Sequence, residues 1–207
     1  MSSHSNMLHC MVLSPGELSD TSYHFFHLRQ LRRVRCSLDS VSASTLVHAF
    51  VTSRVDYYNA ILGGATKAST DRLQRVLNAA ARVVSNTRKF DSGLSNMMHI
   101  DLHCLEVPDR VTYKLSVMVY HCMHGTAPKY LCDLCTLVAD VASRRQLRSA
   151  SQNILLVPRY KRSGLGKRAF SVAGPLVWNS IVDCLRDPAL ELASFKRQLK
   201  TFLFVRY

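Results

Sequence analysis

Apolar residues recur every three or four positions over most of the first two-thirds of the chain, and this spacing favours helices over strands. Between residues 21 and 38, Leu28, Leu31, Val34 and Leu38 fall on one arc of a helix. Three basic residues fall roughly on the opposite arc: Arg29, Arg32 and Arg33. The pattern predicts a helix with one face to pack and another that presents guanidinium groups.

Two more helices are expected before residue 85. One runs from about residue 42 to 62 and is ended by Gly63 and Gly64. The next opens at Thr70, a good N-cap residue. Its predicted buried face consists of Leu73, Val76, Leu77, Ala80 and Val84, and its predicted outer face carries Arg72, Arg75 and Arg82. The arrangement of apolar residues inside and arginines outside therefore repeats.

A fourth helix is predicted between Pro108, which suits a first helical turn, and Gly125, which suits a helix end. Its apolar stripe comprises Val111, Leu115, Met118, Val119 and Cys122. Residues 85–106 show no clear period and are expected to form a connecting loop, and residues 128–137 are expected to form a short helical turn. A last helix is expected after Pro188.

The composition changes between Val141 and Val182, where no acidic residue occurs. Residues 154–157 form a short apolar run with β propensity, and several Gly and Pro residues follow it. The basic residues inside this stretch are Arg144, Arg145, Arg148, Arg159, Lys161, Arg162, Lys167 and Arg168. We expect an extended or hairpin-like basic segment here.

The predicted fold is therefore mainly α: a bundle of about five helices, with the basic extended segment placed before a C-terminal helix. The expected organisation has four parts. They are a loose N-terminal lead-in at 1–20, a helical bundle at 21–140, the basic segment at 141–182 and the C-terminal helix at 183–207.

Charge indicates the class of partner. The 207 residues include 27 Lys and Arg against 14 Asp and Glu, a formal net charge of +13. Such an excess favours polyanions, nucleic acid before anionic membrane; the alternative is a basic protein with no such partner.

Seven irregularly spaced cysteines fit a reducing compartment, and no stretch approaches the ~20 apolar residues of a membrane span. We expect a nuclear or cytoplasmic protein that is neither secreted nor membrane-bound.

No catalytic constellation is evident. The chain has no Asp-Asp pair for two-metal chemistry, and Gly164–Lys167 is followed by Arg168 where a phosphate loop needs Ser or Thr. Neither a GxSxG nor an HExxH motif occurs. We therefore predict no catalytic residue, no cofactor and no small-molecule substrate.

Two groups of residues admit a functional and a purely structural interpretation. His121, Cys122, His124, Cys132 and Cys135 include one CxxC and supply enough ligands for zinc, but their spacing is irregular and favours buried Cys and surface His.

Tyr160, Phe170 and Trp178 lie among the basic residues and are suited to base stacking. For Phe170 and Trp178 we favour a place in the core, and for the neighbouring charges we favour phosphate contact.

Six sequence blocks in order resemble the region that follows the polymerase domain in reverse transcriptases of non-LTR (LINE-type) retrotransposons. In the first half they are FHLRQLRRVR (26–35), LVHAFVTSRVDYYN (46–59) and LQRVLNAAAR (73–82). In the second half they are SRRQLRS (143–149), RAFSVAGP (168–175) and VWNS (177–180). The resemblance extends over roughly residues 21–205.

The resemblance implies thumb-like helices and a C-terminal extension that contact RNA or DNA through the backbone. The active-site aspartates of that family lie upstream of these blocks, so it implies binding without catalysis, with an upstream polymerase domain as a further partner. The residues expected to contact nucleic acid are Arg29, Arg32, Arg33, Arg72, Arg75, Arg82, Arg159, Lys161, Arg162, Lys167 and Arg168. The alternative is a transposon relic without function, or a helical protein-interaction module.

Overall fold

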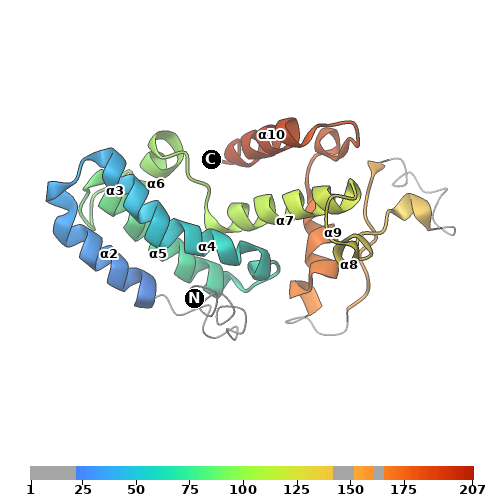
Figure 1. Ribbon diagram of the computed structural model, residues 1–207, viewed down its shortest axis with the longest axis horizontal. Helices are drawn as coiled ribbons and strands as arrows, with labels where there is room; N and C mark the ends of the chain where they lie inside the picture. Colours follow the sequence, from blue (N-terminus) through green and yellow to red (C-terminus); the bar gives the residue numbers. More distant parts are fainter. Residues whose placement is uncertain (1–21, 142–151, 161–165) are drawn as a thin grey trace, which may run out of the picture. The chain divides into compact units, whose positions relative to one another are not determined.

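A computed structural model describes residues 22–141, 152–160 and 166–207, and these residues are mainly helical (Figure 1). The mainly α prediction is confirmed, and among the described residues no β-strand is present, only an isolated antiparallel bridge between Leu137 and Leu155. Contacts divide the described chain into two compact units, 22–58 with 67–104 and 59–66 with 105–207. This division differs from the single bundle expected over 21–140. The lead-in expected at 1–20 lies outside the described residues.

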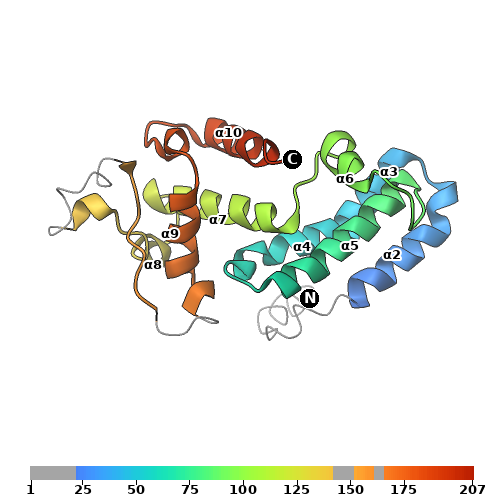
Figure 2. The ribbon, with the colours of Figure 1, turned by 180° about the vertical axis from the view of Figure 1, so that it is seen from behind.

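The described part of the first unit is built from three long helical segments and a short one. Its elements are α2 (Ser22–Val34), η3 (Arg35–Ser37), α3 (Ser40–Val47), η4 (His48–Thr52), α4 (Ser53–Tyr58), α5 (Lys67–Ser85), α6 (Leu94–Asn96) and η6 (Met97–Asp101). Figures 1 and 2 show α2 and α5 side by side, with the continuous run α3–η4–α4 returning against them. The apolar stripes of these helices meet in one core that includes Leu28, Leu31, Val47, Val51 and Val76.

Local signals explain where these helices begin and end. The Asp39 carboxylate accepts hydrogen bonds from the backbone N–H groups of Val41 and Ser42, and so caps the N-terminus of α3. Hydrogen bonding, chiefly with Ser42, lowers the pKa of Asp39. Gly64 follows the helical run with a φ of 66°, which confirms that the Gly-Gly pair ends it.

Three expectations for the first unit need correction. Helix α5 starts at Lys67, so Thr70 lies inside its first turn, where its hydroxyl donates to the Lys67 carbonyl. Val34 is exposed rather than buried, because α2 ends at this residue. The stretch expected to be a loop at 85–106 contains the short helical pieces α6 and η6.

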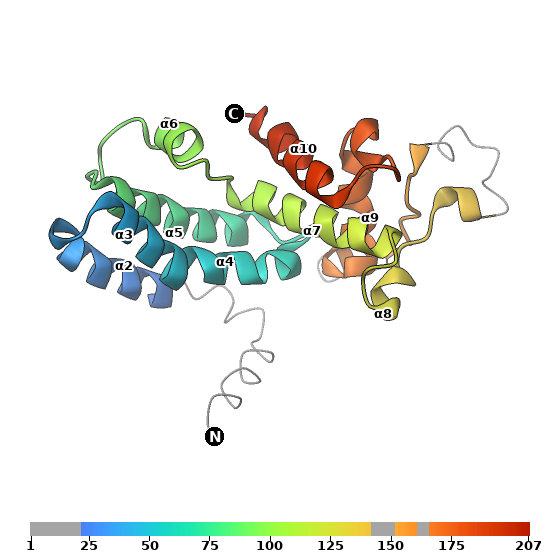
Figure 3. The same cartoon turned by 45° about the horizontal axis from the view of Figure 1, so that its top comes forward.

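The second unit is organised around α7 (Val107–Met123). Its other elements are η5 (Asn59–Leu62), α8 (Lys129–Cys132), η7 (Val138–Asp140), η9 (Gly166–Arg168), α9 (Phe170–Ser180), η10 (Asp183–Arg186) and α10 (Leu192–Phe204). Both α9 and α10 pack on α7, and Figure 3 shows α10 lying along it. The core formed in this way includes Val119, Trp178, Phe195, Leu199 and Leu203.

The predicted extended segment at 141–182 is partly wrong, because residues 170–180 form α9. Gly174 and Pro175, which indicate a break in the sequence, are buried inside this helix. A Cβ atom on Gly174 would lie 3.1 Å from a methyl group of Val119. The glycine therefore allows α9 to approach α7 closely, and the packing gained offsets the hydrogen bond that Pro175 cannot donate.

Candidate nucleic-acid interface

Helix α2 presents three of the predicted arginines to solvent. Leu28 and Leu31 are buried on one side of the helix, which leaves Arg29, Arg32 and Arg33 exposed on the other. Among the residues that the structure describes, no carboxylate pairs with any of these three guanidinium groups. They are sterically and electrostatically available to an external anion.

Helix α5 contributes two more exposed arginines, Arg72 and Arg75. Among the described residues, only one hydrogen bond involves either side chain. In it, Arg75 Nε donates to the Asp71 carbonyl over a long distance of 3.4 Å. Arg82 differs from the prediction: its side chain is half-buried, and its Nε atom is buried without a hydrogen-bond partner among the described residues. Arg82 is therefore less accessible to a phosphate than Arg72 or Arg75.

Arg35 belongs to the same basic run in the sequence but has a structural role. Its Nε donates to the Val83 carbonyl at 2.8 Å, and Nη2 donates to the Val84 carbonyl at 2.8 Å. Its Nη1 donates to the Leu38 carbonyl at 2.7 Å. The guanidinium thus satisfies the last carbonyls of α5 and joins that helix end to the end of α2. The sequence pattern does not separate this arginine from its neighbours.

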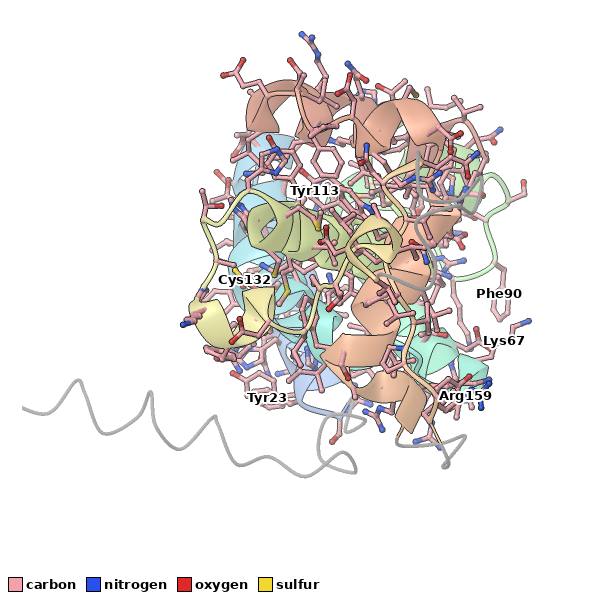
Figure 4. All side chains as sticks on the ribbon, turned by 90° about the vertical axis from the view of Figure 1, so that its right-hand side faces the viewer. Tyr23, Lys67, Phe90, Tyr113, Cys132 and Arg159 are labelled. Atoms are coloured by element: carbon pink, nitrogen blue, oxygen red, sulfur yellow. The ribbon has the colours of Figure 1, made fainter. Side chains whose placement is uncertain are left out.

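The second unit holds the remaining predicted residues. Arg159 (labelled in Figure 4) and Lys167 are exposed, and Arg168 is half-buried. The two chain segments that carry them lie against each other, because a Cβ on Gly166 would be 3.0 Å from the Cβ of Tyr160. Lys161 and Arg162 lie outside the described residues, as do Arg144, Arg145 and Arg148.

Trp178 and Phe170 belong to the core, as predicted. Trp178 is buried, its indole N–H donates to the Asn153 carbonyl at 3.0 Å, and Phe170 packs at the edge of the same core. The Asn179 amide binds the backbone N–H and the carbonyl of Leu155, both at 2.9 Å. Two neighbouring side chains of α9 therefore hold residues 153–155 in place.

Arg186 is a buried cation in the second unit, and nothing in the local sequence pattern distinguishes it from an exposed arginine. Its side chain is 5% exposed, and it forms a salt bridge with Asp183. It also donates to the carbonyls of Gln152, Asn179 and Ile181. Because its hydrogen-bonding capacity is used internally, Arg186 stabilises the fold and offers little to a ligand.

The thiols of Cys122, Cys132 and Cys135 lie close enough to influence one another. Burial, and then the neighbouring Cys122 and Cys132, raises the pKa of Cys135 to about 12. The nitrogens of His124 instead face the carbonyls of Tyr120 and Pro188 at 2.9 and 3.1 Å. Within the described part of the chain, no group of three or more His, Cys, Asp or Glu side chains is arranged to hold a metal ion.

A groove in the first unit, about 490 Å³ in volume, is lined by hydroxyl, imidazole and apolar groups. The lining residues are Ser40, Val41, Ser44, Thr45, His48, Val84 and Leu102. No carboxylate, cysteine, Lys or Arg is among these described lining residues.

Comparison with protein-family models, curated proteins and solved structures finds no match to this chain. None of the helices described is both long enough and apolar enough to cross a membrane.

Proposed function

We propose that this chain binds nucleic acid through the phosphate backbone and does so without catalysis. The observation that carries the proposal is the set of exposed arginines on two adjacent helices of the first unit, unpaired with any described carboxylate. They are Arg29, Arg32 and Arg33 on α2 and Arg72 and Arg75 on α5. Burial of Leu28 and Leu31 in the core fixes which side of α2 faces outward.

Phosphate contact suits this arrangement because guanidinium groups bind phosphate oxygens bidentately and give up little hydration. Binding to phosphates carries no direct sequence information, so the chain binds many sequences with similar affinity. Arg159 and Lys167 of the second unit extend the proposal as further phosphate contacts. The resemblance to the post-polymerase region of LINE-type reverse transcriptases supports the same function, with an upstream polymerase domain as the proposed source of catalysis.

The direct test removes the three charges of α2. The variant Arg29→Gln/Arg32→Gln/Arg33→Gln keeps polar, helix-compatible side chains at exposed positions, so the fold is preserved. We expect its affinity for a fluorescein-labelled 20-nucleotide RNA to fall at least about tenfold at 50 mM salt, measured by fluorescence anisotropy.

The matched control is Lys196→Gln/Arg197→Gln/Lys200→Gln on α10, which removes the same number of charges from one helix of the second unit. A general charge effect would weaken binding equally in both variants. Equal losses, or an α2 variant that binds as tightly as the unchanged chain, would contradict the proposed interface.

A further inference from the structure

Four aromatic rings lie together at the surface of the first unit. Tyr23, Phe26 and Phe50 are 41%, 55% and 41% exposed, and His27 is half-buried among them. Tyr23, Phe26 and His27 share one side of α2 because they are spaced i, i+3 and i+4. We name these four residues the aromatic face. Large rings gathered at a surface indicate a binding site more often than rings exposed singly.

The rings of the aromatic face hold one another in place. The rings of His27 and Phe50 are stacked, with centroids 5.5 Å apart and planes inclined by 9°. Tyr23 and Phe26 contact the His27 ring edge-on, with centroid separations of 4.4 and 5.5 Å. Phe50 lies in η4, the π-helical turn between α3 and α4. Mutual contact fixes the ring orientations, so little entropy is lost when a flat ligand stacks on them.

Cations border the aromatic face, and the described helices that form it carry few acidic residues. The Arg54 guanidinium lies 4.3 Å from the centroid of the Tyr23 ring. Arg29 and Arg33 follow Phe26 at i+3 and i+7, so they lie on the same side of α2. The segment from α2 to α4 contains two acidic residues, Asp39 and Asp56, and the Asp39 carboxylate caps α3.

We infer that the aromatic face binds unpaired bases, so that the chain prefers single-stranded over double-stranded nucleic acid. This inference rests on the proposed function and extends it from phosphates to bases. The Phe26 ring offers a face for stacking, and Arg29 and Arg33 lie about 4.5 and 10 Å further along the helix axis, within reach of the phosphates of adjacent nucleotides. An apolar protein surface fits less well, because it would strip water from three cations without pairing them.

The test compares strand forms with a variant that removes one ring. Phe26→Leu keeps an apolar side chain but no π face. Phe90→Leu is the matched control, because Phe90 is 90% exposed on a loop of the same unit and lies outside the aromatic face (Figure 4). Each variant of the full chain is titrated with a 20-nucleotide RNA, with the same sequence as a blunt duplex, and with an abasic strand of equal length. Circular dichroism verifies that helicity is unchanged.

We expect Phe26→Leu to bind the single strand about tenfold more weakly than the unchanged chain, since one base stacked on one ring contributes affinity of that order. Affinity for the duplex and for the abasic strand stays within about twofold, and Phe90→Leu behaves like the unchanged chain. The inference would be overturned if the unchanged chain bound single strand and duplex equally, or if Phe26→Leu weakened binding to both equally. Either result would leave phosphate binding intact. Failure to bind any of the three would overturn the proposed function as well, and would point to a protein ligand for the aromatic face.

Discussion

Arg35 and Arg186 differ from Arg29, Arg32 and Arg33 in what their guanidinium groups contact. Arg35 donates to three backbone carbonyls, and Arg186 donates to carbonyls and to Asp183. Hydrogen-bonding groups satisfied inside the protein are not free for a phosphate. Arg35 and Arg186 therefore count toward the net charge of +13 but are not available to a ligand.

Residue-scale chemistry also predicts how the cysteines react. Cys135 has a pKa raised to about 12, first by burial and then by Cys122 and Cys132, whereas Cys36 and Cys184 are exposed. Because thiolate is the reactive form, this raised pKa leaves Cys135 protonated and slow to react at pH 8. We expect iodoacetamide to label Cys36 and Cys184 in the native protein and Cys135 only after unfolding, as measured by peptide mass spectrometry.

The same shift has a consequence for stability. The Cys135 pKa is higher in the folded chain than its ordinary value of 9.0, so folding favours the protonated thiol. Its contribution to stability is complete below pH 9 and is lost as the pH rises toward about 12. Labelling of native Cys135 at the rate of Cys184 at pH 8 would contradict the raised pKa of this partly buried thiol.

At the scale of elements, Gly64 tests why the helical run from Ser40 to Leu62 ends where it does. Gly64 has a φ of 66°, and a Cβ at this position would lie 2.5 Å from the backbone oxygen of Lys167. Gly125 has nearly the same φ, 65°, but nothing lies within 4 Å of its Cβ position. An alanine at Gly125 would therefore introduce backbone strain alone, and an alanine at Gly64 would introduce both backbone strain and steric overlap.

We expect Gly125→Ala to lower the free energy of unfolding by about 1–2 kcal/mol, the strain of a left-handed alanine. Gly64→Ala should lower the free energy of unfolding by at least about 1 kcal/mol more than Gly125→Ala, because backbone atoms must also move. Urea denaturation followed by circular dichroism measures both. Equal losses would mean that Gly64 and Lys167 are not in contact.

Periodicity predicted most helices because their signal is local. Helices α2, α5, α7 and α10 all have buried stripes at three- and four-residue spacing, as do the segments from which they were predicted. Helix α9 was not predicted because packing against α7, and not local propensity, stabilises it. Gly174 and Pro175 disfavour a helix locally, and the contact with α7 outweighs this preference.

For the candidate interface, the sequence predicts what depends on one helix but not what depends on the packing of two. The exposure of Arg29 and Arg33 follows from the burial of Leu28 and Leu31 on the other side of one amphipathic helix. The partial burial of Arg82 and the capping role of Arg35 depend on a neighbouring element, about which local spacing carries no information. The aromatic face was not predicted, because Phe50 meets His27 only when η4 packs beside α2.

At the scale of the whole molecule, each unit has its own core and its own exposed cations. The cores contain different residues, Val76 and Val51 in the first unit and Phe195 and Leu199 in the second. Arg29, Arg32, Arg33, Arg72 and Arg75 belong to the first unit, and Arg159 and Lys167 to the second. If the molecule binds phosphate as proposed, its binding is a sum of charge contacts, each of which releases counterions from the nucleic acid.

If exposed arginines hold the phosphate backbone, the affinity for RNA must fall as the salt concentration rises, because each arginine releases counterions from the nucleic acid. With the five arginines of the first unit engaged on a single strand, the plot of log K against log salt concentration should have a slope of about −3.5 or steeper. The α2 triple variant should flatten this slope by about 2. A slope near zero for the unchanged chain, or the same slope in both proteins, would contradict the account.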